Sequence, residues 1–296
     1  MTAGDAVPLT ADVLRTWPLP SDPAADKHAR GTVLVIAGTV RTPGAALLAG
    51  TAALRAGAGR LQLATVRSSA AALGAAVPEA LVVGLAASPD GSPDPTEATQ
   101  LLREQAATAD ALVIGPGLED LSATAGILSG LLPLVGDRAV IVLDAMAVAA
   151  FPSLDDRARA SASGRIVFTP NPAEATTLAP EASGDLAPAD LAAHAARAHS
   201  AAVTIAGRVA SPDGRGWVAR GAVAGLGTSG SGDVLAGLVG EVAARCGDAV
   251  QAACWGTYLH VEAGVRLGDR VGRVGYLARE LLDEVPRALD DAAPSA

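Results

Sequence analysis

The most constraining feature of this sequence is a set of short apolar segments without alternation of polar and apolar residues. Four of them read GTVLVIAG (residues 31–38), ALVIG (111–115), AVIVLD (139–144) and AVTIA (202–206). A strand that is apolar at successive positions is buried on both faces, and such strands are typical of parallel sheets covered by helices on each side. The sequence therefore predicts an α/β protein with a central, mostly parallel sheet.

Segments rich in alanine separate these strands. We expect helices at residues 44–58, 96–107, 186–199, 234–245 and 248–267, and further strands at 61–64, 81–84, 165–169 and 216–219. Small side chains let helices lie close to a sheet, which favours a layered α/β architecture. No repeat, linker or change of composition divides the chain. We therefore expect a single domain over residues 1–296, with a core at about 27–285 and a frayed end after Pro286.

Charge and composition exclude several functional classes. The chain has 22 Lys+Arg against 31 Asp+Glu, a net charge of -9, and only 2% aromatic residues. It therefore lacks the basic face and stacking side chains of a nucleic-acid-binding protein. No apolar run reaches the ~18 residues of a membrane span, and no secretory signal is visible. With two cysteines, Cys246 and Cys254, which we expect to be small buried apolar residues, a reducing, cytoplasmic location is predicted.

Candidate functional residues are sought where the strands end, because ligands of doubly wound sheets bind outside the carboxyl ends of the strands. The segment at residues 227–233, GTSGSGD, is the strongest candidate. Its glycines allow backbone N–H groups to converge at a helix N-terminus, which favours a phosphate. Asp233 is placed to accept a proton from a substrate hydroxyl. The alternative is a flexible loop closed by Asp233 as a helix N-cap.

At each of three other strand ends, two interpretations remain open. Asp144 is either the N-cap of the helix that follows, which we favour slightly, or a carboxylate near magnesium. Asn171 and Glu174 either orient magnesium-bound water or form a capping box. Gly117 either brings the backbone close to a ligand or ends a strand. His260 is interpreted as a core residue.

Taken in order, the motifs resemble the ADP- or ATP-dependent NAD(P)H-hydrate dehydratases of the ribokinase-like superfamily. The match covers roughly residues 27–282 and rests on six segments: VLVIAGTVRTPGAALLAGTAALRAGAG, ALVIGPGL, VLDAMAV, FTPNPAEATTLA, GTSGSGDVLAGLVG and GTYLHVEAG. The resemblance implies a ribokinase-like three-layer αβα fold. It also implies repair of hydrated NADH or NADPH with ADP or ATP and Mg²⁺, and a homo-oligomer that is often a tetramer. The epimerase domain of fused bacterial members is not expected here.

The same resemblance assigns roles to individual residues. Asp233 matches the catalytic acidic residue, and Gly232 matches a glycine that contacts phosphate. Ala45, Gly117 and Asn171, with Asp233, match positions of the substrate site. Glu174 is expected to hold magnesium through water. The nucleotide is expected at two segments, which comprise Ala206, Gly207 and Arg208 and, in the glycine turn, Ser229, Gly230, Ser231 and Gly232.

Two departures from the family pattern keep alternatives open. The family usually has histidine where this chain has Asn171, and the resulting N-x-x-E pattern is that of sugar kinases. A kinase for a sugar or a vitamin alcohol is therefore a second hypothesis. The family also has a lysine in its nucleotide segment, where this chain reads Ala206-Gly207-Arg208, while its one lysine, Lys27, lies far upstream. A lost lysine–phosphate contact costs about 1.5–3 kcal/mol, so a catalytically weak nucleotide-binding relative is a third hypothesis.

Overall fold

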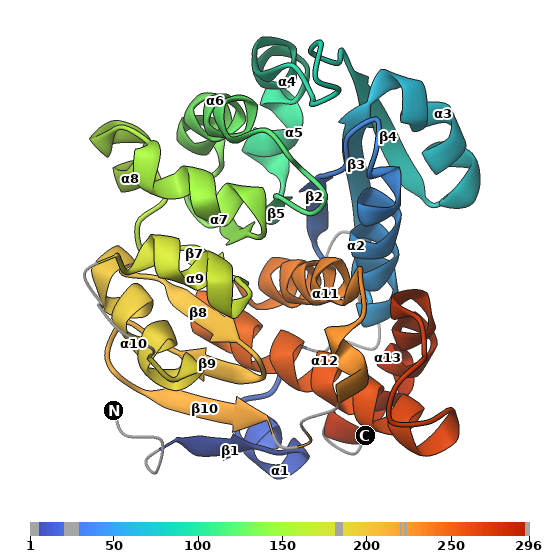
Figure 1. Cartoon of the computed structure of the whole chain (residues 1–296), viewed down its shortest axis with the longest axis vertical. Coiled ribbons are helices and arrows are strands. Elements are labelled where there is room, and N and C mark those ends of the chain that lie inside the picture. The colour runs from blue at the N-terminus through green and yellow to red at the C-terminus, as the bar shows by residue number, and fades with distance from the viewer. Residues whose placement is uncertain (1–5, 21–29, 181–185, 220, 222–223, 294–296) are drawn as a thin grey trace.

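The computed structural model describes residues 6–20, 30–180, 186–219, 221 and 224–293. Within these residues one ten-stranded sheet has the order β1-β10-β9-β8-β7-β6-β5-β2-β3-β4 (Figure 1). Its strands are β1 Val7–Leu9, β2 Thr32–Ile36, β3 Arg60–Val66, β4 Ala80–Leu85, β5 Ala111–Ile114, β6 Val140–Leu143, β7 Ile166–Phe168, β8 Ala202–Ile205, β9 Arg208–Ala210 and β10 Gly216–Ala219. Neighbouring strands are parallel, except that β9 runs antiparallel to β8 and β10. The predicted mostly parallel sheet is confirmed.

Helices cover both faces of the sheet (Figure 1). One face carries α1 Ala11–Arg15, α2 Pro43–Ala56, α3 Arg67–Ala76, α11 Ser231–Cys246, α12 Ala249–Arg270 and α13 Ala278–Ala292. The other carries α4 Pro95–Leu101, α5 Arg103–Thr108, α6 Leu121–Leu131, α7 Met146–Ala150, α8 Asp156–Ser161, α9 Pro172–Leu178 and α10 Pro188–His199. The layers are those of the predicted αβα fold.

The strand sequences explain why both faces are covered. In β2, Val33 and Val35 belong to the core on the α2 and α11 side, whereas Leu34 and Ile36 belong to the core on the opposite side. All four side chains are 0% exposed. Because successive side chains of a strand point to opposite faces, an unbroken apolar run needs helices on both.

The order of the strands reverses at the centre of the sheet. From β2, the chain adds β3 and then β4 on one side, and it then returns to place β5 on the other side of β2. Such a reversal separates the two loops that follow the neighbouring strands and opens a crevice between them. The carboxyl ends of β2 and β5 are therefore where a ligand site is expected.

Small residues set the distance between α2 and α11. A Cβ atom added to Gly237 of α11 would collide with the carbonyl oxygen of Ala49 and lie 2.9 Å from the Cβ of Ala52, both in α2. A Cβ at Gly240 would likewise collide with Val113 of β5. The glycines of α11 thus allow it to lie directly against both a helix and the sheet.

Several predictions about individual elements are corrected. The chain does not fray after Pro286, because α13 runs on to Ala292 with Leu282, Val285 and Ala288 buried on one face. Burial of this apolar stripe outweighs the hydrogen bond that the proline removes. The helix expected at 96–107 is two helices, α4 and α5. Cys254 is fully buried as predicted, but Cys246 is only partly buried.

Two further expectations concern Lys27 and membrane spans. Lys27, and with it the expected start of the core, falls in an undescribed segment. Among the described helices, none is long and apolar enough to cross a membrane.

The substitution Gly237→Ala tests the contact between α2 and α11. We expect it to lower the free energy of unfolding by about 1–3 kcal/mol, because the added methyl group forces the helix backbones apart. Gly74→Ala is the matched control, since Gly74 lies in α3 with its nearest potential contact at 3.7 Å. That change should stabilise by about 0.5–1 kcal/mol. Denaturant unfolding of both variants measures the difference, and equal effects would contradict this account of the packing.

Candidate active site

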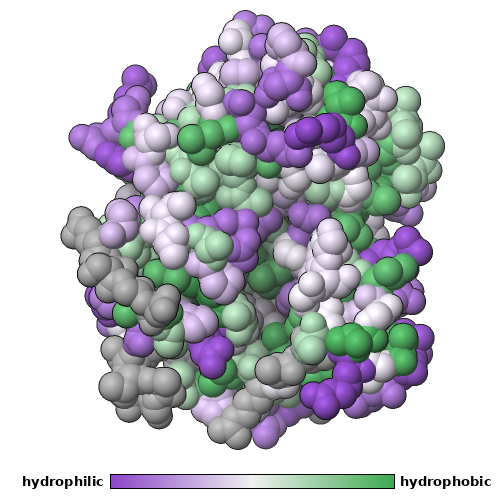
Figure 2. Space-filling view, viewed as in Figure 1, coloured by the Kyte–Doolittle hydropathy of each residue, from purple (hydrophilic) through white to green (hydrophobic). Residues whose placement is uncertain are grey.

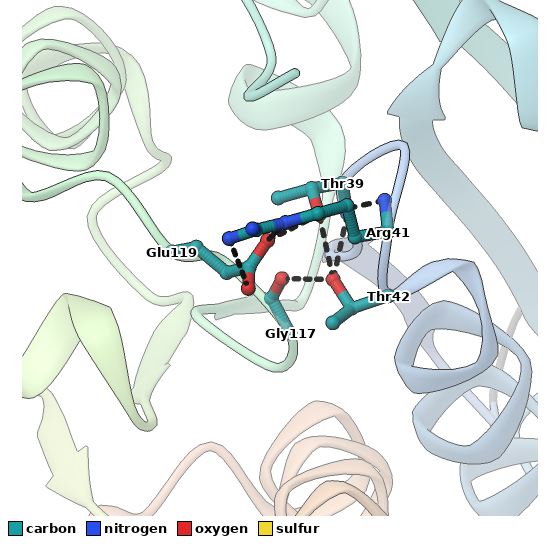
Figure 3. A network of polar contacts seen from close by, with 5 residues as sticks. All are labelled: Thr39, Arg41, Thr42, Gly117 and Glu119. Carbon is teal, nitrogen blue, oxygen red and sulfur yellow. Dashed lines mark hydrogen bonds and ion pairs between the residues drawn. The ribbon is translucent and has the colours of Figure 1, made fainter. Parts of the chain in front are cut away.

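Two loops that are distant in the sequence are hydrogen-bonded to each other where β2 and β5 end (Figure 3). Thr42, before α2, donates from its hydroxyl to the carbonyl oxygen of Gly117 at 2.6 Å. Thr39 donates from its hydroxyl to Oε2 of Glu119 at 2.9 Å. The backbone N–H of Thr39 donates to Oγ1 of Thr42 at 3.1 Å. The first two bonds join the β2–α2 loop to the β5–α6 loop across the switch point, and the third lies within the β2–α2 loop.

Arg41 completes this network at the surface. Its Nε and Nη2 atoms donate to the two carboxylate oxygens of Glu119 at 3.1 and 2.9 Å, a bidentate geometry. The hydrogen bonds from Arg41 and Thr39 lower the pKa of Glu119. Sequence reasoning did not identify Thr39, Arg41, Thr42 or Glu119. They lie within four residues of the strand-ending Gly38 and Gly115, so a search extended past these glycines finds them.

The structure brings Ala45 and Gly117, two predicted substrate residues, together. Ala45 lies in the first turn of α2, and a Cβ atom at Gly117 would be 2.5 Å from its Cβ. Gly117 also has a φ of 66°, a conformation that favours glycine. The glycine is therefore required by the close approach of the two loops.

The predicted anion site lies at the N-terminus of α11. The helix begins at Ser231 rather than near Asp233, with Gly230 as the N-cap in the left-handed region at φ 87°. Asp233 is thus the third residue of the helix, and its interpretation as the N-cap is wrong. Among the described residues, no acceptor is present for the backbone N–H groups of Gly232 and Asp233. Free N–H groups at the start of a 16-residue helix favour an anion.

Ser231 is turned away from this anion site. Its Oγ lies 2.8 Å from Nε2 of His260 in α12, and both residues are buried. Burial lowers the pKa of His260 to about 4, so its imidazole is neutral near pH 7. The prediction of a core histidine is confirmed, and the pair anchors the first turn of α11 to α12.

Asp144 follows β6 and is 4% exposed. It does not cap α7, because Ala145 is at the N-cap position with a φ of 46°. Instead, Oδ1 of Asp144 accepts a hydrogen bond from Thr169 Oγ1 at 2.8 Å. Burial is the largest cause that raises the pKa of Asp144 to about 7; the charges of Asp233 and Glu174 act in the same direction, and the Thr169 bond opposes them. The Asp144 carboxyl group therefore lies within range of the charges of Asp233 and Glu174.

Asp233 is partly withdrawn from water. Burial raises its pKa to about 6. A Cβ atom at Gly230 would lie 3.7 Å from Oδ2 of Asp233 and 2.5 Å from Cδ1 of Leu48 in α2. The Asp233 carboxylate thus lies near the helix that also carries Ala45. A carboxylate with a pKa of about 6 is suited to accept a proton near neutral pH.

Asn171 and Glu174 form a complete capping box at the start of α9. The side chain of Asn171 accepts from the Glu174 N–H at 2.9 Å, and the Asn171 N–H donates to Glu174 Oε2 at 3.0 Å. The Nδ2 group of Asn171 also donates to Glu174 Oε1 at 2.7 Å. The capping interpretation is confirmed. Burial raises the pKa of Glu174.

The predicted nucleotide segment is a tight hairpin between β8 and β9. Ala206 and Gly207, with φ angles of 48° and 78°, connect the paired residues Ile205 and Arg208. Positive φ at both central residues matches the twist of the strands. Arg208 Nη1 lies 3.4 Å from the Ala206 carbonyl oxygen. The expected strand at 202–206 therefore ends one residue early, and the glycine between two apolar runs is the signal for the hairpin that was missed.

In the space-filling view the molecule is hollowed near its centre, between α9 and α11 as they appear in Figure 1 (Figure 2). The site described above combines hydrogen-bond donors at the N-terminus of α11 with the carboxylates of Asp233, in the same helix, and Asp144, which follows β6. Such a site can hold an anion beside a proton acceptor.

Comparison with known proteins identifies the family of this chain. A family model described as NAD(P)H-hydrate dehydratase matches residues 33–287. The chain is 45% identical, over 98% of each chain, to a Xanthomonas campestris protein named ADP-dependent (S)-NAD(P)H-hydrate dehydratase. It spans about half the length of bifunctional NAD(P)H-hydrate repair enzymes that it also matches.

Solved structures support the fold. A ribokinase-like superfamily protein from Enterococcus faecalis has a TM-score of 0.81 and 23% identity, and the match covers 99% of this chain and 98% of that one. The ADP/ATP-dependent NAD(P)H-hydrate dehydratase from Bacillus subtilis, co-crystallized with ATP/Mg²⁺, has a TM-score of 0.76 and 25% identity, with 98% and 100% covered. The predicted ribokinase-like fold is confirmed. On the family model and the 45% identity over nearly the whole chain, this protein belongs to the NAD(P)H-hydrate dehydratase family.

Proposed function

We propose that this protein repairs hydrated NADH or NADPH by ADP-dependent dehydration. The observation that carries the proposal is the N-terminus of α11, where two N–H groups without an acceptor among the described residues lie beside the half-buried carboxylate of Asp233. This arrangement suits a phosphoryl group approaching a hydroxyl that must lose its proton. ADP is the favoured nucleotide because the 45% identical relative is named ADP-dependent.

In the proposed reaction Asp233 accepts the proton of the ring hydroxyl of the hydrate. The hydroxyl oxygen attacks the terminal phosphorus of ADP, the bond from that phosphorus to AMP breaks, and the N–H groups of Gly232 and Asp233 stabilise the charge on the transferring group. The ring nitrogen then expels phosphate. Loss of a proton from the neighbouring ring carbon restores the double bond of NAD(P)H.

Magnesium belongs to the proposal as a partner of the nucleotide. In the part of the chain that the structure describes, no three His, Cys, Asp or Glu side chains gather into a metal-binding group. Magnesium often binds through one or two carboxylates together with substrate phosphates and water. Asp144 and Glu174 fit that limited role, the latter through water, because both of its oxygens accept bonds from Asn171. When bound, the ion would neutralise phosphate charge.

The remaining predicted contacts complete the proposal. Ala45, Gly117 and Asn171 would line the site of the hydrated ring, and Ala206, Gly207 and Arg208 would contact the nucleotide. A single domain, a cytoplasmic location and a homo-oligomer, such as a tetramer, are parts of the same proposal. The kinase hypothesis gains no support from Asn171 and Glu174, because the capping box accounts for both.

Asp233→Asn tests the proton acceptor. We expect turnover to fall about 10²–10⁴-fold, because the amide cannot take the hydroxyl proton. The assay follows recovery of NADH absorbance from purified hydrate with ADP and Mg²⁺. Asp190→Asn is the matched control, since Asp190 is also the third residue of a helix, α10. Near-normal activity of Asp233→Asn would remove Asp233 from the mechanism, and an inactive wild-type protein would refute the proposed function.

The pH dependence of activity gives a second test. Asp233 must be ionised to accept a proton, so activity should be full above its pKa of about 6 and should fall as the pH drops through that value. Rates are measured from pH 5 to 8, with the spontaneous loss of substrate subtracted. Asp144, whose pKa is about 7, is the competing group. If the inflection disappears in Asp144→Asn, the assignment to Asp233 is wrong.

Arg208→Gln tests the nucleotide segment. If Arg208 contacts a nucleotide phosphate, we expect the KM for ADP to rise at least about tenfold with little change in the KM for the hydrate, as for the loss of one charged hydrogen bond. Arg138→Gln, at an exposed position, is the control. An unchanged KM for ADP would show that the Arg208 side chain does not contact a nucleotide phosphate.

A further inference from the structure

Thr42 occupies the N-cap position of α2 but does not cap the helix. Threonine at this position usually accepts a hydrogen bond from a backbone N–H of the first turn, a contact worth about 1 kcal/mol. Here the side chain makes no capping bond. Its hydroxyl instead donates across the switch point to the Gly117 carbonyl oxygen, 75 residues away in the sequence. Thr42 therefore does not make the usual capping bond and instead connects two loops.

The bond from Thr42 acts on the residue that approaches Ala45 most closely. Gly117 faces the first turn of α2, where a Cβ atom would be 3.1 Å from the Thr42 carbonyl oxygen and 2.5 Å from the Ala45 Cβ. The Ala45 N–H donates to the Thr42 carbonyl oxygen at 3.2 Å. Thr42 thus contacts Gly117 with its side chain (Figure 3) and Ala45 with its backbone, so it sets the spacing between them.

The rest of the network holds Thr42 in place. Its Oγ1 atom accepts a bond from the N–H of Thr39, which is 1% exposed. Thr39 is in turn bonded to Glu119. The outer pair of Arg41 and Glu119 is more exposed, at 71% and 34% of the side chain, so water and salt weaken it. The hydroxyl groups of Thr39 and Thr42 therefore do more to hold the two loops together than the exposed ion pair does.

We propose that Thr42 is a positioning residue of the substrate site, whose hydroxyl holds the Gly117 backbone against Ala45 and so shapes the opening for the hydrated nicotinamide ring. This inference rests on the proposed function. Thr42 acts before the chemical step by holding two loops in the geometry that the ring requires. It should therefore affect the hydrate and not the nucleotide, because the N-terminus of α11 is held separately by the contact between Ser231 and His260.

The test compares Thr42→Val, which replaces the hydroxyl by a methyl group of similar size, with Thr42→Ser, which keeps it. We expect Thr42→Val to raise the KM for the hydrate about three- to tenfold, as for the loss of one neutral hydrogen bond. The KM for ADP should stay within about twofold. Thr42→Ser should restore the wild-type KM. Steady-state kinetics with each substrate varied in turn, and the melting temperature, are the measurements.

Thr99→Val is the matched control, because the Thr99 hydroxyl also donates to a carbonyl oxygen, that of Pro95 at 2.8 Å, but within α4. It should leave both KM values unchanged. Thr42→Ala replaces Thr42→Val if the latter does not fold. Glu119→Gln should have a smaller effect on the KM for the hydrate than Thr42→Val.

Three outcomes would overturn the inference. They are an unchanged KM for the hydrate in Thr42→Val, an equal rise in the KM for ADP, and an equal defect in Thr42→Ser. Each of these requires an active wild-type enzyme and leaves the proposed function standing. A wild-type protein that does not restore NADH overturns the proposed function, and the positioning role with it.

Discussion

The contact between α2 and α11 is the constraint on which the rest of the site depends. Gly237 lets α11 lie directly against the backbone of Ala49 and the side chain of Ala52 in α2. The N-terminus of α2 carries Ala45, and that of α11 carries Asp233. Because this contact lies near the middle of each helix, it fixes how the N-termini of α2 and α11 lie relative to each other. The distance between the predicted substrate residues and the carboxylate is therefore set by residues that contact no ligand.

The electrostatics of the site follow from withdrawal of acidic groups from water. Asp144 and Asp233 have raised pKa values because burial disfavours their ionised forms. The negative charges of Asp144 and Asp233 favour binding of a group that is positively charged. The N-terminus of α11 supplies only a partial positive charge. In the proposed reaction, magnesium that enters with the nucleotide would supply the remaining positive charge.

The sequence allowed much of this to be predicted, with characteristic errors. Strand ends were found because apolar runs stop at glycine, proline or an acid, and the capping box of Asn171 and Glu174 follows a local rule. Asp144 was misassigned because a buried bond from Thr169, 25 residues away, replaces capping. The role of Pro286 was misjudged because its helix is stabilised by packing on other helices. Local rules failed where a distant partner supplies the larger free energy.

By itself the sequence determined the layers, the parallel sheet, the family motifs and the glycine turn before α11, because these depend on periodicity and on residues adjacent in the chain. Only the tertiary structure decided which strand ends meet. It placed Thr42 against Gly117, turned Ser231 toward His260 and brought Asp144 within range of the charges of Asp233 and Glu174. Hydrogen bonds and pKa shifts depend on distances of a few ångströms between residues far apart in sequence, and those distances exist only after the helices have packed on the sheet.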